Sequence, residues 1–193
     1  TVASFKGGVG KTTTAIHLAA YLQQHKPTLL IDGDANRSAT LWAKRGELPF
    51  RIVDDRKAPK FARDYEHIVI DTYAHPNKED LESIVEGCDL LILPTTPEAM
   101  ALDALVLTVT ALRELRAENY RILLTMIPPK PNKDGQESRE LLERSGYPLF
   151  KGGISRLTAF QRASMAGVPV YATADDRAER AWEEYVAVAK EMQ

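Results

Sequence analysis

The sequence predicts an α/β fold, doubly wound, with a mostly parallel sheet and helices on both faces. Short apolar runs of strand length alternate with helical patterns along the chain. A glycine-rich stretch separates the first apolar run from the first helical pattern, the position at which α/β proteins bind phosphate. Acidic residues follow two further runs, where an open sheet binds its ligands. We expect the 193 residues to form one domain, residues 1–193.

The individual elements follow from the spacing of apolar residues. Buried strands are predicted at residues 2–5, 28–31, 68–70, 90–93 and 122–126. Helices are predicted at residues 11–24, about 38–44, about 78–86, 102–116 and 136–144. A last helix is predicted from the apolar positions Ala178, Ala181, Trp182, Tyr185, Ala189 and Met192. This alternation implies parallel strands joined by crossover helices.

Composition narrows the class of protein. The net charge of -2 excludes a uniformly basic nucleic-acid binder, although a local basic patch is compatible with it. The single cysteine, Cys88, allows no disulfide framework. The sequence has no apolar run of about 18 residues, and glutamates accompany the polar face of the last helix. We therefore expect a cytoplasmic protein without a membrane partner.

The stretch K-G-G-V-G-K-T, residues 6–12, is a variant of the phosphate-binding pattern G-x-x-x-x-G-K-[ST], with Phe5 at its first glycine position. Its glycines let backbone N–H groups turn inward at a helix start, where the helix dipole favours a triphosphate. Lys11 is expected on the β and γ phosphates, Thr12 on a magnesium ion and Thr13 near the α phosphate. A glycine-rich turn without a ligand is the disfavoured alternative. The predicted nucleotide-binding residues here are Lys6, Gly7, Gly8, Val9, Gly10, Lys11, Thr12 and Thr13.

Together with LLIDGDANRSAT (residues 29–40) and HIVIDT (residues 67–72), this loop resembles the deviant Walker A ATPases of the ParA/MinD superfamily. The resemblance implies a P-loop NTPase fold, slow magnesium-dependent ATP hydrolysis and a sandwich homodimer closed by ATP. It assigns catalytic roles to Lys6, Lys11 and Asp34, with Lys6 reaching the phosphates of the partner subunit. Without the resemblance, Lys6 alone would be read as a solvated loop charge.

Three carboxylates end predicted strands. The resemblance assigns Asp34 to orienting the attacking water, and Asp32 to the magnesium shell or to holding the loop. Asp34 could instead cap the following helix, but Ser38 is better placed for that. Asp71 matches the Walker B aspartate, which would hold magnesium through water. It begins the sequence DTYAHP, where many relatives have a DTPPG-like switch, and we expect His75 to be a loop histidine.

The adenine contacts are less clearly marked. Relatives often carry an asparagine where this chain has Met126, and prolines beyond it. Pro128 and Pro129 are therefore predicted to pack on the base, with a rigid surface loop as the equally weighted alternative.

The sequence shows no helix-turn-helix ahead of the first strand and only a short segment between Val53 and His67, which is similar to minimal ParA proteins of the ParF-like or carboxysome-positioning McdA-like type. SRLTAFQRASMAGVPV, residues 155–170, is similar to their late R-x-x-x-x-x-A-x-x-x-G region. The resemblance implies ATP-dependent, non-specific DNA binding on the nucleoid. It also implies partition or positioning of a cargo, which would be a plasmid, a chromosome region or a carboxysome, with a ParB-, ParG- or McdB-like adaptor that stimulates hydrolysis.

Candidate DNA-phosphate contacts are Lys151, Arg156 and Arg162, supported by Arg139 and Arg144. Taken singly, each of these residues fits a solvated mixed-charge surface equally well. Two further functions remain open: a metabolic ATP-dependent ligase similar to dethiobiotin synthetase, and a nucleotide-dependent scaffold without a DNA partner.

Overall fold

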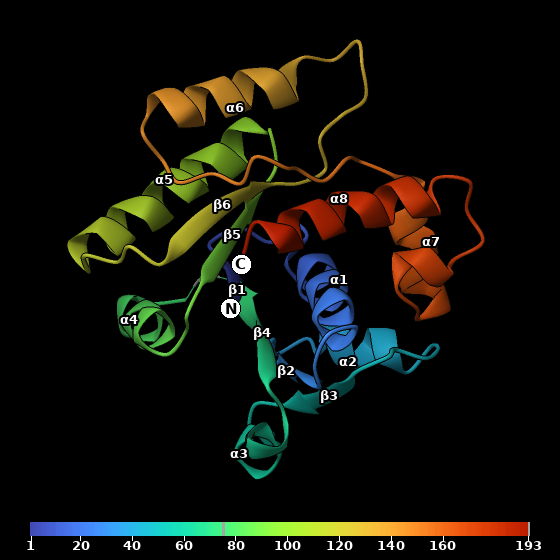
Figure 1. Cartoon of the computed structure of the whole chain (residues 1–193). Coiled ribbons are helices and arrows are strands. Elements are labelled where there is room, and N and C mark those ends of the chain that lie inside the picture. The colour runs from blue at the N-terminus through green and yellow to red at the C-terminus, as the bar shows by residue number, and fades with distance from the viewer. Residues whose placement is uncertain (75, 193) are drawn as a thin grey trace.

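A six-stranded parallel sheet forms the centre of the computed structural model, which describes residues 1–74 and 76–192 (Figure 1). The strand order is β3-β2-β4-β1-β5-β6. The strands are β1 (Val2–Ser4), β2 (Thr28–Asp32), β3 (Arg51–Asp54), β4 (His67–Ala74), β5 (Leu91–Thr95) and β6 (Tyr120–Leu124). His75, expected in a loop, lies outside the described residues.

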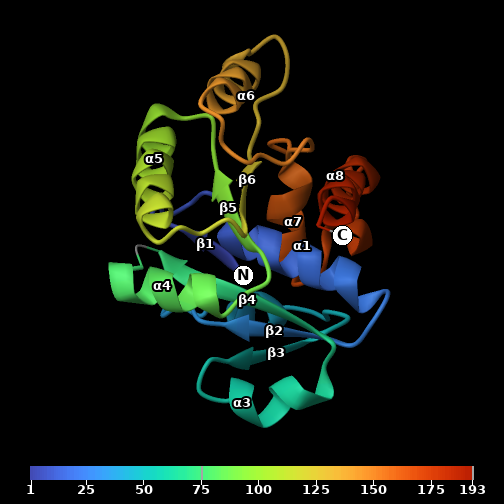
Figure 2. The same ribbon diagram turned by 60° about the vertical axis from the view of Figure 1, so that its left-hand side comes forward.

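Helices cover both faces of the sheet, which confirms the predicted fold class (Figures 1 and 2). On one face, the side chains of Leu30 and Val69 pack with α1 (Lys11–Gln23), α2 (Ser38–Ala43), α7 (Thr158–Ala166) and α8 (Ala178–Lys190). On the other face, Leu91 and Leu93 pack with α4 (Lys78–Glu86), α5 (Ala99–Glu114) and α6 (Asp134–Arg144). A smaller cluster around Leu29 lies under α3 (Ala58–Phe61). Two 3-10 turns, η1 (Ala62–Asp64) and η2 (Val170–Ala172), complete the described elements.

Strand β3 and helices α3 and α7 are absent from the sequence-based expectation. Helix α3 is one turn of four residues, while β3 and α7 are weakly marked in the sequence. Strand β3 has only two apolar residues, Ile52 and Val53, between charged ones, and it pairs with β2 alone at the edge of the sheet. Helix α7 buries only the small residues Ala159 and Ala163, so its periodicity is weak in the sequence. Both elements are stabilised by packing that local sequence does not reveal.

Strand β4 is longer than predicted. It continues past Ile70 to Ala74, because β1 pairs with it as far as Ser4 opposite Ala74. Asp71 therefore lies within a strand, directly beside Asp32 of β2. Among the helices of residues 1–74 and 76–192, none has the length and apolar character needed to cross a membrane.

Candidate functional site

The glycine-rich loop between β1 and α1 curls around open space. Gly8 and Gly10 have φ values of 78° and 85°, in the left-handed region that side chains disfavour, and Gly10 directly precedes the first residue of α1. A Cβ atom built at Gly8 would meet nothing within 4 Å. Behind the loop, the Thr125 hydroxyl donates to the carbonyl of Val9 at 2.8 Å. The loop is thus held from the sheet side and leaves its concave side free.

This loop opens into a cavity of about 520 Å³ that brings most of the predicted phosphate-site residues together with Asp34. Its lining residues are Gly7, Gly8, Gly10, Lys11, Thr12, Thr13, Asp34, Asn36, Ser38, Leu41, Trp42, Arg45, Ala74, Met126 and Ser164. Val9 is buried beneath the loop rather than lining the cavity. Lys6 is half-buried, and its backbone N–H donates to the Ser4 hydroxyl at 3.0 Å.

Lys11 is the buried cation of this cavity, with 8% of its surface exposed. Burial lowers the pKa of its ammonium group, and the nearby carboxylates of Asp71 and Asp34 oppose that shift. Its charge therefore lies at the cavity and near both carboxylates, where it can neutralise a bound anion.

Asp71 is fully buried, and its carboxylate oxygens have no hydrogen-bond partner among the described residues. Burial raises the pKa of this group to about 7, while the neighbouring Thr12 hydroxyl and Lys11 oppose the shift. Asp32 and Asp34 raise it further. An unpaired buried carboxylate beside a threonine hydroxyl is an oxygen donor set that fits a hydrated magnesium ion.

Asp32 has a different environment although it neighbours Asp71. One of its oxygens accepts hydrogen bonds from the backbone N–H and the hydroxyl of Thr40, at 2.8 and 2.6 Å. The other accepts from the backbone N–H of Asp34 at 3.3 Å. Of the two roles left open for Asp32, these contacts favour holding the loop over ligating the metal.

Asp34 faces the cavity and does not cap a helix. Its Oδ1 accepts from the backbone N–H of Asn36 at 2.9 Å. The residue that precedes α2 is Arg37, in a left-handed conformation and without a side-chain cap, so the expectation that Ser38 caps this helix is wrong. Instead, Asp32 satisfies the N–H of Thr40 in the first turn of α2. One Asp34 oxygen is thereby fixed, and the side chain lies opposite the phosphate loop.

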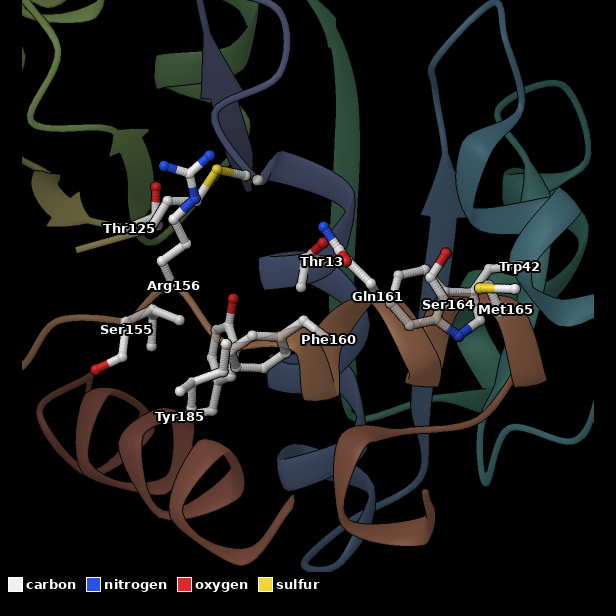
Figure 3. Close-up of a pocket in the computed structure, with 14 residues that line it drawn as sticks. Thr13, Trp42, Thr125, Ser155, Arg156, Phe160, Gln161, Ser164, Met165 and Tyr185 are labelled. Atoms are coloured by element: carbon white, nitrogen blue, oxygen red, sulfur yellow. The ribbon is translucent and has the colours of Figure 1, made fainter. Parts of the chain in front are cut away.

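A second cavity, of about 470 Å³, adjoins Gly10 and Thr13 (Figure 3). Gln161 points toward Thr13 in this view, and Arg156 and Met126 line the same space. The remaining lining residues are Trp42, Thr125, Ile154, Ser155, Leu157, Phe160, Ser164, Met165 and Tyr185. The cavity has the position and the mixed polar and apolar walls expected for the nucleoside part of a nucleotide.

The two prolines predicted to contact the base lie elsewhere. Pro128 and Pro129 line a third cavity, of about 740 Å³, which shares Arg156 with the second cavity. Neither proline lines the two cavities that the phosphate loop borders. Their contact with a base stays a prediction, while Met126, with φ of 51°, lines both of those cavities.

The predicted DNA contacts have varied surroundings. Arg162 pairs with the buried Asp175 at 2.8 Å, and the guanidinium of Arg139 donates to the carbonyls of Phe150 and Gly152. Arg144 pairs with Glu140 on its own helix. Lys151 is exposed, and Arg156 lies at the cavities described above. Arg139 therefore has a structural role, and Lys151 and Arg156 are the better candidates.

Several cavity residues are not identified from the sequence. They are Trp42, Arg45, Phe160, Gln161, Ser164 and Met165. All but two come from the stretch of residues 155–170. The similarity of this stretch to ParA proteins is a usable signal, but only its arginines have side chains that suggest a ligand contact on sequence grounds.

Comparison of the whole sequence with protein families identifies a known domain. Residues 1–170 match the model for the CobQ/CobB/MinD/ParA nucleotide binding domain. The chain belongs to this family. The family resemblance and the P-loop fold class are thereby confirmed, in agreement with the sequence prediction.

Individual relatives fit this membership. The chain is 33% identical to the maintenance of carboxysome distribution protein A of Gloeobacter kilaueensis, covering 97% of this chain and 90% of that protein. A plasmid partition protein of Borrelia burgdorferi bound to AMPPNP has 22% identity and a TM-score of 0.72, covering 100% of this chain and 98% of that one. The MinC:MinD complex of Aquifex aeolicus gives 18% identity and a TM-score of 0.78, covering 99% and 93%. At these identities the two solved structures show a shared fold.

Proposed function

We propose that this protein is a ParA-type ATPase that closes an ATP-dependent sandwich dimer, binds DNA without sequence preference and positions a cargo with an adaptor protein. The observation that carries the proposal is the cavity in which the glycine-rich loop, Lys11 and Asp34 face one another. Such a site suits phosphoryl transfer, which depends on positioning and charge neutralisation more than on a strong base.

Each residue then has a defined task. The loop N–H groups and the helix dipole of α1 would bind the phosphates, and Lys11 would add a positive charge beside the β and γ phosphates. Thr12 and Asp71 would hold magnesium, which neutralises the phosphate oxygens when it is bound. Asp34 would orient the attacking water, and Asp32 keeps the Asp34 loop in place through Thr40. The nucleoside would extend along Thr13 into the cavity shared with Met126.

The mouth of the nucleotide cavities has an apolar rim that supports a dimer. Leu41, Met126 and Met165 are 45%, 39% and 77% exposed, and each lines one or both cavities. Large apolar side chains gathered around an open site are typical of an interface. A second copy of the chain would cover this rim and bring its own Lys6 to the phosphates.

The cargo is proposed from the relative that covers nearly the whole chain, which maintains carboxysome distribution. A carboxysome is therefore favoured over a plasmid or chromosome region. The adaptor would be McdB-like, and the ATP-bound dimer would be associated with the nucleoid in the cytoplasm. For DNA, the exposed Lys151 and Arg156 would contact phosphates, with Arg162 contributing through its exposed face.

The ligase alternative would place a small substrate beside the phosphates. The third cavity, between the proline-rich loop and the start of α8, is a space that such a substrate could occupy. Its basic lining residues are Lys130, Lys133, Arg156, Arg177 and Arg180. No single observation selects a substrate for it. ATP turnover without any added small molecule favours the positioning ATPase over a ligase.

The proposal is tested by nucleotide binding. Lys11→Ala should reduce ATP affinity by about 100-fold or more, because a buried charge is removed from a site of neutral donors. Lys6→Ala should bind ATP as a monomer yet lose dimerisation and hydrolysis. Calorimetry and light scattering measure these effects, with Lys190→Ala at the exposed end of α8 as the control. Unchanged ATP binding by Lys11→Ala would contradict the phosphate-site assignment.

A further inference from the structure

A buried histidine, His17, lies on α1 one turn below the phosphate loop, and the proposed chemistry leaves it without a role. Its side chain is fully buried. Its Nδ1 is 2.6 Å from the carbonyl oxygen of Thr13, and its Nε2 is 3.0 Å from the backbone nitrogen of Val170 in η2. A backbone N–H can only donate, so Nε2 accepts from Val170 and Nδ1 carries the proton donated to Thr13. One neutral tautomer of His17 therefore connects α1 to η2.

The imidazole also supports the aromatic wall of the second cavity. It stacks on Tyr185 with ring centroids 4.8 Å apart, and it meets Trp42 and Phe160 edge-on at 5.9 and 5.4 Å. All three of these side chains line the cavity beside Thr13. A second link runs parallel to the histidine, because the hydroxyls of Tyr185 and Thr14 lie 3.2 Å apart.

We infer that His17 is a positioning residue for nucleotide binding, which sets the first turn of α1 and the aromatic wall of the nucleoside cavity relative to each other. This inference rests on the proposed ATP site. His17 itself touches no nucleotide. It acts through Thr13, whose carbonyl it binds, and through Trp42, Phe160 and Tyr185. Because the link positions groups proposed to contact the nucleotide equally in the ground state and in the transition state, its loss should raise the KM for ATP more than it lowers kcat.

The test replaces the hydrogen bonds while keeping the packing. His17→Phe keeps an aromatic ring but can make neither bond, whereas His17→Gln can place its amide oxygen near the Nε2 position and accept from the Val170 N–H. For His17→Phe we expect a KM for ATP raised about tenfold with kcat within about twofold, and for His17→Gln a KM closer to that of the parent, because the link to η2 is kept. Assays use only protein shown to be folded by circular dichroism, and Lys190→Ala serves as the surface control.

A second variant guards against a poorly folded His17→Phe. Val170→Pro removes the N–H that His17 accepts, and Pro169 has the extended backbone, with ψ of 154°, that a residue before proline requires. Its KM should rise by a similar factor, and the double variant should be no worse than either single one, since both break the same link.

Additive effects of His17→Phe and Val170→Pro on KM in the double variant would overturn the inference. A folded His17→Phe variant with the parental KM would also overturn it, as would one in which kcat falls while KM is unchanged. These outcomes differ from a failure of the proposed function. In that case the parent itself would neither bind nor hydrolyse ATP, and the inference would fall with it.

Discussion

The phosphate-loop edge of the sheet (residues 6–13, 32–40 and 71) and the C-terminal layer (α7, η2 and α8) border the same cavities but are built differently. At the phosphate-loop edge, polar groups are held by backbone turns, and one carboxylate, Asp71, is left unpaired. Aromatic side chains of the C-terminal layer, Phe160 and Tyr185, pack against His17 of α1, and both ring nitrogens of His17 have hydrogen-bond partners. The phosphate-loop edge therefore has polar groups that can bind a ligand, while the C-terminal layer supports the wall of the cavity beside them.

The largest expected effect tests the phosphate-loop edge. Asp34→Ala should lower kcat by about 100-fold or more, because the attacking water loses its orienting carboxylate while phosphate binding is retained. ATP should still induce the dimer, as measured by light scattering. Asp32→Ala is the informative comparison, since it should lower thermal stability by releasing Thr40 and disturb hydrolysis only indirectly. Parental turnover by Asp34→Ala would move the catalytic role to another residue.

The next prediction separates the two regions by the sign of their pH dependence. The pKa of Asp71 is raised to about 7, so its contribution to stability is present at low pH and is lost as the pH rises from about 4 to about 7. Burial lowers the pKa of His17 to about 4, so its contribution is present above about pH 6.5 and is lost as the pH falls toward 4. Between about pH 4 and pH 7, a rise in pH therefore lowers the stability contributed by Asp71 and raises the stability contributed by His17.

The histidine term is isolated by comparing the parent with His17→Asn, which cannot titrate. Between pH 7 and pH 4 the parent should lose about 3 kcal/mol of unfolding free energy relative to the variant. Tyr185 stacks on the ring without interfering, because burial raises the pKa of its hydroxyl and keeps it neutral. Urea unfolding at a series of pH values measures the difference. A difference independent of pH would show that His17 is not buried in its neutral form.

The phosphate-loop edge and the C-terminal layer also differ in how far the sequence predicts them. The phosphate loop is encoded locally, since Gly8, Gly10, Lys11 and Thr12 stand at fixed spacings that follow from the chemistry of phosphate binding. The strands on either side of it are predicted from the spacing of apolar residues, which is also a local signal. The resemblance assigns Asp71 to magnesium but leaves two roles open for Asp32, because that choice depends on which carboxylate Thr40 reaches after folding.

The C-terminal layer is encoded by long-range packing. His17 and Tyr185 are 168 positions apart, and neither has a pattern that indicates the other. Helix α7 was missed because its buried residues are alanines, and the cavity role of Gln161 and Met165 depends on how that helix lies against α2. Three expectations stay predictions: that residues 1–193 form a single domain, the DNA contacts, and the base contacts of Pro128 and Pro129.

The smallest effect concerns DNA, the function for which the two regions would have to act together. A monomer of net charge -2 has no overall attraction to a polyanion, so binding must come from a local basic patch, doubled when ATP closes the dimer. If each copy neutralises two or three phosphates, log K should fall against log salt with a slope of about -4 to -5, and about half that for the monomer. Lys151→Glu should weaken binding about tenfold for every sequence, since phosphate contacts carry no base information. Arg156→Glu should do the same, but because Arg156 also lines the nucleoside cavity, its effect is measured at ATP concentrations that saturate the variant. Arg162→Glu is a poorer probe, because it would place a second carboxylate beside the buried side chain of Asp175 and lower stability as well.

Fluorescence anisotropy on two unrelated duplexes, with ATP and with ADP across a salt series, measures the salt slope and the effect of each variant on DNA binding. No binding to either duplex under conditions where the dimer forms would remove DNA from the proposed function and leave a nucleotide-dependent scaffold.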